Sequence, residues 1–224
     1  AYLLIGLLAG VALLLLWRLP AGSTSIPSSS GFALTRDLLA RPIIRAAMLT
    51  TAIGHGLMIL VMNATPLAMS VCGLSLETSA EVIRWHMLGM FLPAFVAGPL
   101  VDRLGPTKMA VCGCLLLCLS AGVALSGLRQ EFFLLSSFLL GFGWNLLMVA
   151  GSTLLAQGHT ANERGQAQGL MELGNGVVAT GAAFASGALI STMGWSALNI
   201  AMLPLLLLAL LKLPLRRSQG SLSS

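Results

Sequence analysis

Long apolar runs are the feature that most limits how this chain can fold. A helix needs roughly 18 to 20 apolar residues to cross the hydrocarbon core of a bilayer, and seven stretches approach or exceed that length. They run approximately over residues 1–17, 43–70, 81–101, 107–125, 131–156, 165–193 and 195–213. Only 8% of the residues are charged, against about 25% in a typical soluble domain. The sequence therefore predicts an all-α membrane protein with several transmembrane helices.

A polar stretch separates the first apolar run from the second. Residues 18–42 are rich in Ser, Pro and Gly, which is typical of a flexible linker, and include a short amphipathic segment near Asp37. We therefore expect a membrane helix over 1–17, a linker over 18–42, a six-helix bundle over 43–217 and a tail over 218–224. Because the chain starts without Met, directly in an apolar run, we also expect a fragment or a chain that lacks its N-terminal part.

The basic residues indicate membrane topology rather than nucleic-acid binding. The net charge is +5, but these residues stand singly at the ends of apolar runs and are not interleaved with aromatic residues. If the linker is cytoplasmic, most of them fall on the cytoplasmic side, namely Arg18, Arg36, Arg41, Arg45, Arg103, Lys108, Arg164, Lys212, Arg216 and Arg217. Only Arg84 and Arg129 fall outside. The positive-inside rule then predicts a cytoplasmic C-terminus.

A weak internal repeat relates two of the apolar runs. "IGHGLMILVMNATPLA" aligns with "LGFGWNLLMVAGSTLLA" at a spacing of 87 residues, which pairs Gly54 with Gly141 and Gly56 with Gly143. The two segments cross the membrane in opposite directions. This pattern is typical of an inverted repeat of three helices plus three.

A cluster of charge lies between the third and fourth runs, in "GPLVDRLGPTK" at residues 98–108. Its glycines and prolines predict a sharp turn between antiparallel helices, and a glycine in the helix lets another helix approach closely. A carboxylate at the helix end can pair with a basic group or a neighbouring helix N-terminus, and such contacts would close a cytoplasmic gate. The alternative is a positive-inside turn with no gating role. The residues concerned are Gly98, Asp102, Arg103, Gly105 and Lys108.

This pattern resembles the signature between the second and third helices of each half of a major facilitator superfamily transporter. "TANERGQAQG" at 160–169 resembles the loop before the eleventh helix, with Glu163 and Arg164 at the acidic-Arg-Gly step, although a preceding proline is absent. The resemblance covers essentially the whole chain. It implies that the first run is helix six and that the others are helices seven to twelve, in a bacterial inner membrane.

The resemblance also implies a function. It points to a secondary transporter that moves a small molecule by alternating access, coupled to protons. The N-terminal half of that transporter would be a separate part, missing from this chain, and would supply half of the binding site.

Polar side chains deep inside the apolar runs are the candidates for the transport pathway, because they are costly in a bilayer. Counting about 1.5 Å per residue from the helix ends places most of them near the midplane. The predicted pathway residues are His55, Asn63, Trp144, Asn145, Glu172 and Asn175. Each could instead form only a static hydrogen bond between helices.

Glu172 is the preferred candidate for proton coupling. It shares a helical face with Gly165, Gly169, Gly176, Ala183 and Gly187, and so faces protein or a cavity rather than lipid. A carboxylate there could take up and release a proton as its exposure to water changes.

Other classes of membrane protein fit the sequence less well. An opsin needs a lysine in mid-membrane, but Lys108 and Lys212 lie at the ends of apolar runs. The sequence around Ser152 lacks the motif of an intramembrane serine protease, and there is no nucleotide or metal motif. We therefore expect no enzymatic activity, no cofactor and no metal. A seven-helix receptor and a non-transporting membrane partner remain alternatives.

Overall fold

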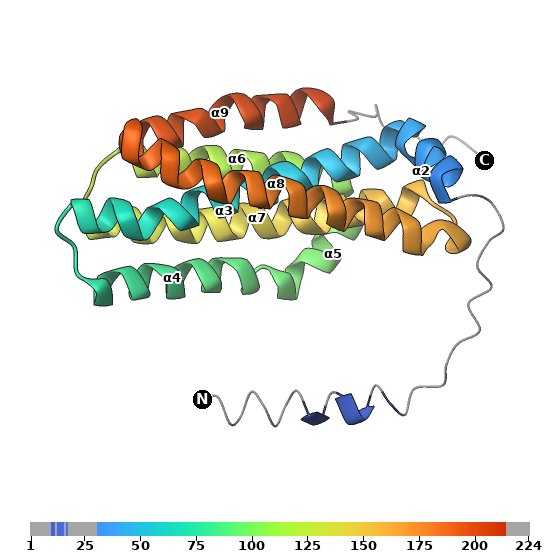
Figure 1. The fold of residues 1–224 in the computed structure, drawn as a ribbon, viewed down its shortest axis with the longest axis horizontal. Coiled ribbons are helices and arrows are strands. Elements are labelled where there is room, and N and C mark those ends of the chain that lie inside the picture. Colours follow the sequence, from blue (N-terminus) through green and yellow to red (C-terminus); the bar gives the residue numbers. More distant parts are fainter. Residues whose placement is uncertain (1–9, 12, 16, 18–30, 214–224) are drawn as a thin grey trace. The chain divides into compact units, whose positions relative to one another are not determined.

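The computed structural model describes residues 10, 11, 13–15, 17 and 31–213, and every regular element in these ranges is a helix. The elements are α2 Gly31–Ala40, α3 Pro42–Val71, α4 Leu76–Phe91, α5 Ala94–Leu104, α6 Pro106–Leu125, α7 Gln130–Gly158, the short η1 Ala161–Glu163, α8 Arg164–Thr192 and α9 Gly194–Lys212 (Figure 1). Residues 1–30 and 31–224 are two separate compact units. The predicted all-α fold is confirmed.

Parts of the expected organisation lie outside the described residues. The described positions between 10 and 17 are helical, within the range expected for a first membrane helix. Residues 1–9, most of the linker (18–30) and the tail beyond 213 are not described. The remainder of the linker forms α2, at the place where a short amphipathic segment was expected near Asp37.

The helices of residues 31–213 have the length and apolar composition needed to cross a membrane. Five qualify alone: α3, α6, α7, α8 with the preceding η1, and α9. A sixth candidate is the pair α4 and α5, whose axes are bent by 40° at a short break. These six correspond to the six predicted runs between residues 43 and 213.

The third predicted run differs from the expectation, because it is two helices rather than one segment over 81–101. The first of them starts earlier, at Leu76, where the Ser75 Oγ accepts a hydrogen bond of 3.2 Å from the Thr78 backbone N–H and caps the helix. The break follows Phe91 and is explained by Pro93, which has no N–H to donate to the Gly89 carbonyl four residues earlier.

The turn between α5 and α6 has the predicted form. Gly105 has a φ of 80°, in the left-handed region that favours glycine, and Pro106 occupies the first turn of α6. The chain therefore reverses direction at the charged stretch, as expected.

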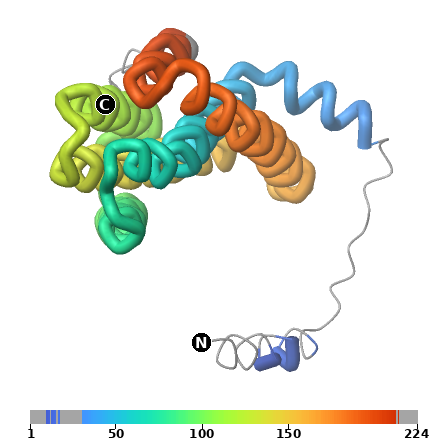
Figure 2. The backbone as a smooth tube through the Cα atoms, turned by 60° about the vertical axis from the view of Figure 1, so that its left-hand side comes forward, coloured from blue at the N-terminus to red at the C-terminus, as the bar shows by residue number. Residues whose placement is uncertain are grey.

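The helix contacts follow a repeat of two triplets, α3 to α6 and α7 to α9. The first helices of the triplets, α3 and α7, contact each other at the centre, and the third helices, α6 and α9, also contact each other. In addition α3 packs along α8 while α7 packs along α4, so each first helix meets the second helix of the other triplet (Figures 1 and 2). The aligned glycines do not share this symmetry, since Gly54 faces Leu147 of α7 whereas Gly141 faces the backbone of α4.

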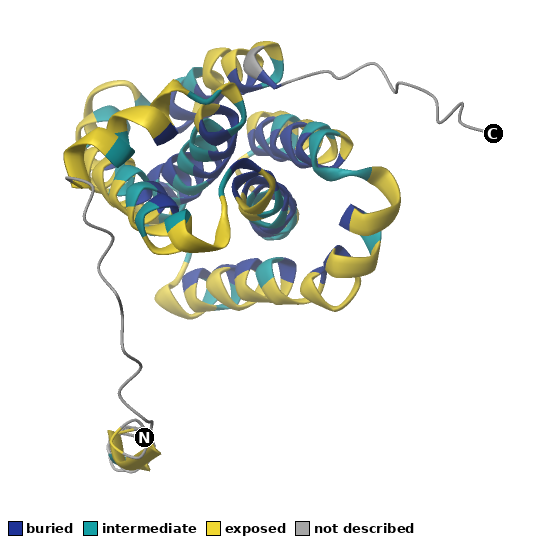
Figure 3. Ribbon diagram, turned by 90° about the vertical axis from the view of Figure 1, so that its right-hand side faces the viewer, coloured by how far each residue is buried: buried dark blue, intermediate teal, exposed yellow. Residues whose placement is uncertain are grey.

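The buried residues face the spaces between the helices (Figure 3), and many large apolar side chains are exposed on the outer surface. Leu117, Leu140 and Leu198 are among the fully buried side chains of the main cluster. Phe133 and Trp195 pack with their ring centroids 5.2 Å apart, and the Trp195 Nε1 donates to the Ala124 carbonyl at 3.1 Å, which ties the start of α9 to α6. An apolar outer surface of this extent suits a lipid environment rather than water.

Candidate functional site

The central helices α3 and α7 bring His55 and Trp144 together. The Trp144 Nε1 donates to the His55 Nδ1 at 3.3 Å, and the ring centroids lie 6.2 Å apart with the rings tilted by 42°. Both side chains are partly exposed. Two predicted pathway residues, 89 residues apart in the sequence, therefore form one aromatic pair with ring surface left uncovered.

Asn145 points toward α4 instead of joining this pair. Its Nδ2 donates to the Met90 carbonyl at 2.9 Å. The two helices are close here because they meet at glycines: a Cβ added at Gly141 would overlap the His86 carbonyl, and one at Gly89 would overlap the Phe138 carbonyl. Close backbone contact through small residues is typical of membrane helices.

Two predicted pathway residues hold buried acceptor atoms without a partner. The Oδ1 atoms of Asn145 and Asn175 form no hydrogen bond with any described residue. The side chains belong to α7 and α8 and are 8% and 5% exposed. Buried polar atoms are rarely left unpaired, so each of these oxygens is a candidate acceptor for a bound molecule or a water.

His86 is a buried polar residue of the same α4–α7 contact. Its Nδ1 donates to the Ser137 carbonyl at 3.0 Å, while its Nε2 has no partner among the described residues. Its neighbour Arg84 is exposed. The two residues point to opposite sides of α4, as their spacing predicts.

Glu172 lies on the open side of α8. Its carboxylate is exposed, and its Oε1 accepts a hydrogen bond of 3.0 Å from the Nε2 of Gln168, one turn earlier on the same helix. A Cβ added at Gly169 or at Gly176 would meet nothing within 4 Å. Within the described chain the small-residue face around Glu172 is therefore uncovered. Asn63, the remaining predicted pathway residue, is exposed on α3.

The predicted gate residues between α5 and α6 are also uncovered. Asp102, Arg103 and Lys108 are exposed, and none forms an ion pair within residues 31–213. A Cβ at Gly98 would meet nothing within 4 Å, so the close helix approach expected there does not occur within the described part of the chain. These side chains are free to contact a surface outside it.

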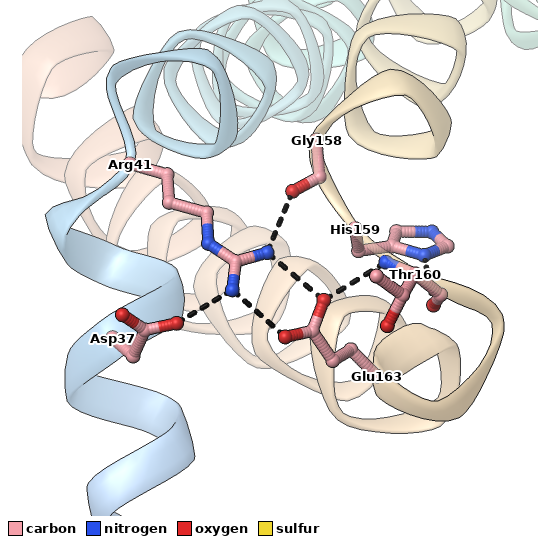
Figure 4. Close-up of polar contacts among 6 residues, drawn as sticks. All are labelled: Asp37, Arg41, Gly158, His159, Thr160 and Glu163. Atoms are coloured by element: carbon pink, nitrogen blue, oxygen red, sulfur yellow. Dashed lines mark hydrogen bonds and ion pairs between the residues drawn. The ribbon is translucent and has the colours of Figure 1, made fainter.

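Glu163 behaves differently, because it is part of a polar network centred on Arg41 (Figure 4). The Arg41 guanidinium donates to both oxygens of Glu163, at 2.7 and 2.9 Å, to the Asp37 carboxylate at 2.5 Å and to the Gly158 carbonyl at 3.0 Å. Glu163 also closes a capping box with Thr160 at the start of η1. The hydrogen bonds from Glu163 and Asp37 raise the pKa of Arg41 above its ordinary value, so this residue stays charged.

The network fastens α2 to the ends of α7 and α8. The Gln166 Nε2 of α8 donates to the Thr35 Oγ1 at 2.6 Å and to the Gly31 carbonyl, and Leu38 is fully buried beneath α2 against apolar residues of α3, α7 and α8. Arg164, the other predicted residue of this loop, is exposed.

The sequence pattern did not indicate that Arg41 is a site residue. It figured there only as one of many cytoplasmic basic residues, yet it is the centre of the network. Its spacing of four from Asp37 is a recognisable helical pair. Its pairing with Glu163 joins residues 122 positions apart, and no local pattern indicates that.

Known proteins resemble this chain over most of its length. A family model described as Major Facilitator Superfamily matches residues 82–223. The chain is 35% identical over 181 residues to the riboflavin transporter RfnT of Brucella anthropi, which covers 80% of this chain and 45% of that protein. It is 30% identical over 165 residues to the putative niacin/nicotinamide transporter NiaP of Bacillus subtilis, which covers 70% of this chain and 40% of that protein.

A third relative is the uncharacterized MFS-type transporter YdeG of Bacillus subtilis, 34% identical over 118 residues, with 52% of this chain and 27% of that protein covered. The chain thus spans less than half the length of each of these relatives. All three are named as transporters and none as an enzyme, which confirms the expectation that the chain is not an enzyme. Since the family model covers well over half of the chain, the chain belongs to the Major Facilitator Superfamily.

Proposed function

We propose that this chain is the C-terminal half of a secondary transporter that moves a small molecule across the membrane by alternating access, coupled to protons. The observation that carries the proposal is the pair of buried amide oxygens, Asn145 Oδ1 and Asn175 Oδ1, which lack partners among the described residues. A buried polar atom without a partner is costly in a membrane-spanning bundle. A solute bound at either oxygen in the complete transporter accounts for its missing partner, and the transporter relatives support that explanation.

The substrate that best fits these groups is a planar nitrogen heterocycle with hydrogen-bond donors. An amide oxygen only accepts, so the solute must bring an N–H or O–H group. The partly exposed rings of His55 and Trp144 offer aromatic faces for stacking. Two relatives are named for riboflavin and for niacin/nicotinamide, which are nitrogen heteroaromatic compounds.

Uptake by the complete transporter in proteoliposomes tests both parts of this proposal. Asn175→Leu should abolish riboflavin or nicotinamide uptake while the protein still folds, because the acceptor is removed and the branched shape of the side chain is kept. Asn199→Leu is the matched control, since its Nδ2 donates to the Trp195 carbonyl at 2.9 Å within α9. Parent-level uptake by Asn175→Leu would exclude this residue from the site. Uptake of other solutes but of neither vitamin would refute the substrate class alone.

Glu172 is the proposed coupling residue. It is the acidic residue on the uncovered face of α8, and its hydrogen bond to Gln168 is local. In alternating access this carboxylate would take a proton from one side of the membrane and release it to the other. The N-terminal half, which the shorter span of the chain relative to its relatives leaves outside, would cover this face.

The proposed orientation places α2 and the α5–α6 turn in the cytoplasm of a bacterial inner-membrane protein. The ends of α2, α5 and α7 lie at the same end of the bundle in Figure 1, and the basic residues in these connections support a cytoplasmic location by the positive-inside rule. In this arrangement residues 1–17 are the sixth helix, 18–42 the central loop, 43–217 the C-terminal bundle and 218–224 the tail. Asp102 and its neighbours would contact the other half as a cytoplasmic gate.

A further inference from the structure

A groove runs along the outer side of the bundle between α3, α8 and α9. It has a volume of about 460 Å³, within the range of pockets that bury a small ligand. In Figures 1 and 2, α8 and α9 meet at their connection and diverge toward the end where α2 lies, with α3 between them. Leu205 and Leu208 of α9 form an exposed rim, and Gly181 of α8 lies in the lining.

The lining excludes a polar solute. All of its residues are Gly, Ala, Val, Leu or Ile, from Leu49 to Leu60 on α3, from Val178 to Leu189 on α8 and from Ala201 to Leu208 on α9. A hydroxyl or amide bound there would lose its hydrogen bonds to water without replacement. The groove therefore suits hydrocarbon and is distinct from the site that holds His55 and Trp144.

Along α3 the groove is about as long as one leaflet of the membrane is thick. Leu49 and Leu60 are 11 residues apart, roughly 16 Å along a helix at 1.5 Å per residue, and one leaflet of the hydrocarbon core is about 15 Å thick. If the 30 residues of α3 are centred on the bilayer, the core extends over about 20 of them, from about residue 47 to about residue 66. The end of the groove at Leu49 then lies in the leaflet on the side of α2, and the groove extends past the midplane to Leu189, three residues before the end of α8.

A positive charge stands at the mouth of the groove. Arg45 precedes Leu49 by four residues and Ala52 by seven, and therefore lies on the same stripe of α3, one turn outside the predicted core. It is exposed and forms no ion pair in the part of the chain that is described. The residues of α3 that pack with α2, such as Ile44 and Ala47, lie on another face and leave this stripe open.

The groove faces away from the surface proposed to meet the N-terminal half. Glu172 and Gly181 are nine residues apart on α8, which places them about 180° apart around the helix at 100° per residue. A partner that covers the Glu172 face therefore leaves the groove open to the bilayer.

We infer that this groove holds an acyl chain of an anionic phospholipid of the cytoplasmic leaflet, whose phosphate is bound by Arg45. The inference goes beyond the proposed transport function but uses the proposed orientation. The fit rests on two matched features: an apolar lining that begins in the leaflet on the side of α2, and a cation at the headgroup level beside that end. Such a lipid would fill the opening that the divergence of α8 and α9 leaves over α3.

Lipid retention by the complete transporter tests the headgroup contact. The protein is reconstituted in nanodiscs of phosphatidylcholine with a minor fraction of phosphatidylglycerol, released into detergent, and its bound lipids are counted by native mass spectrometry. Arg45→Gln should lower phosphatidylglycerol retention by about fivefold, the weight of one basic residue at an anionic membrane surface, and leave phosphatidylcholine unchanged. Arg36→Gln, which removes an exposed charge of α2, is the matched control and should have no effect.

A second pair of variants tests the groove itself. A Cβ at Gly181 or at Gly122 of α6 meets nothing within 4 Å, and both residues are exposed. Gly181→Leu should fill the groove and remove the retained lipid of either headgroup, whereas Gly122→Leu should not. Equal retention in Gly181→Leu and Gly122→Leu would overturn the inference. Dimers of the parent protein that dissociate in Gly181→Leu would also overturn the inference, because a second copy of the protein would then occupy the groove. Since the readout is lipid retention, a failure of the transport proposal would not affect it.

Discussion

The glycines of α7 and most of those of α8 have opposite surroundings. In α7, a Cβ at Gly141 would overlap the backbone of α4, and one at Gly143 would overlap the Gly113 carbonyl of α6. In α8, a Cβ at Gly165, Gly169 or Gly176 would meet nothing within 4 Å. The same residue type thus packs this bundle in one helix and forms an open face in the other. This open face, beside an exposed carboxylate, is where the proposed N-terminal half would pack.

Leucine substitutions in the two helices should differ strongly in their effect on protein stability, and this is the largest effect expected. Gly141→Leu should destabilise the protein by about 1–3 kcal/mol or more, because the α4 backbone it would overlap cannot rotate away as a side chain can. Gly176→Leu should leave stability unchanged or slightly improved, since glycine is a poor helix former. The measurement is the temperature at which the detergent-solubilised 224-residue chain loses its monodisperse gel-filtration peak.

If both variants unfold at the same temperature, the glycines of α7 and α8 do not differ in packing as described. A fall for Gly176→Leu alone would mean that the face of α8 is packed in the solubilised protein. Transport by Gly176→Leu adds a second readout: if the face meets the N-terminal half, the added side chain should reduce transport although the protein is stable.

The next largest effect is expected at Glu172, on the open face. Glu172→Gln keeps the hydrogen-bonding shape but removes the titratable group. It should abolish accumulation driven by a proton gradient and leave exchange of substrate across the membrane intact. Glu131→Gln is the control, because Glu131 is an exposed carboxylate paired with Arg129 at the start of α7. Full gradient-driven accumulation by Glu172→Gln in proteoliposomes would exclude this residue from coupling.

How much could be predicted from the sequence depends on the range of the interaction. The lengths of the apolar runs are local, and they predicted α3, α6, α7, α8 and α9 to within a few residues. The break at Pro93 is also local, but the apolar run continues through it and was interpreted as one segment. A proline inside a membrane run is a signal that could have indicated the break.

Interactions between distant residues were predicted less well. His55 and Trp144 were both selected, from depth alone, but nothing in the sequence indicated that they form a hydrogen bond. Arg41 and Glu163 were not linked at all. Helix geometry separates Trp144 and Asn145 by about 100°, but tertiary packing decides which helix each one meets: Trp144 bonds to α3 and Asn145 to α4.

The charges around Arg41 have ion-pair partners, whereas those of the α5–α6 turn are exposed. Substitutions in these two groups should differ in their effects on proteolysis and on transport, and both effects should be smaller than those above. Arg41→Gln should release α2, because its contacts to Glu163, Asp37 and Gly158 are lost together. Limited trypsin digestion should then cut faster at the exposed Arg36 within α2. Asp102→Asn should leave this cleavage rate unchanged and lower transport, since its proposed partner is in the other half. Parent-level transport by Asp102→Asn would leave the turn with a topological role only.

The smallest effect is expected at Trp144, on the packed side of the comparison. Trp144→Phe keeps an aromatic ring against α3 but removes the Nε1–H that donates to His55. A hydrogen bond of this kind contributes about 0.5–1.5 kcal/mol, and its length of 3.3 Å favours the lower end. If the pair orients the His55 ring toward the substrate, the apparent affinity should fall by about two- to fivefold, with little change in thermal stability. If the pair serves only packing, stability should fall by the same small amount and the affinity should not change. Substrate titration and thermal unfolding of this one variant therefore decide whether the His55–Trp144 pair belongs to the binding site or to the core of the bundle.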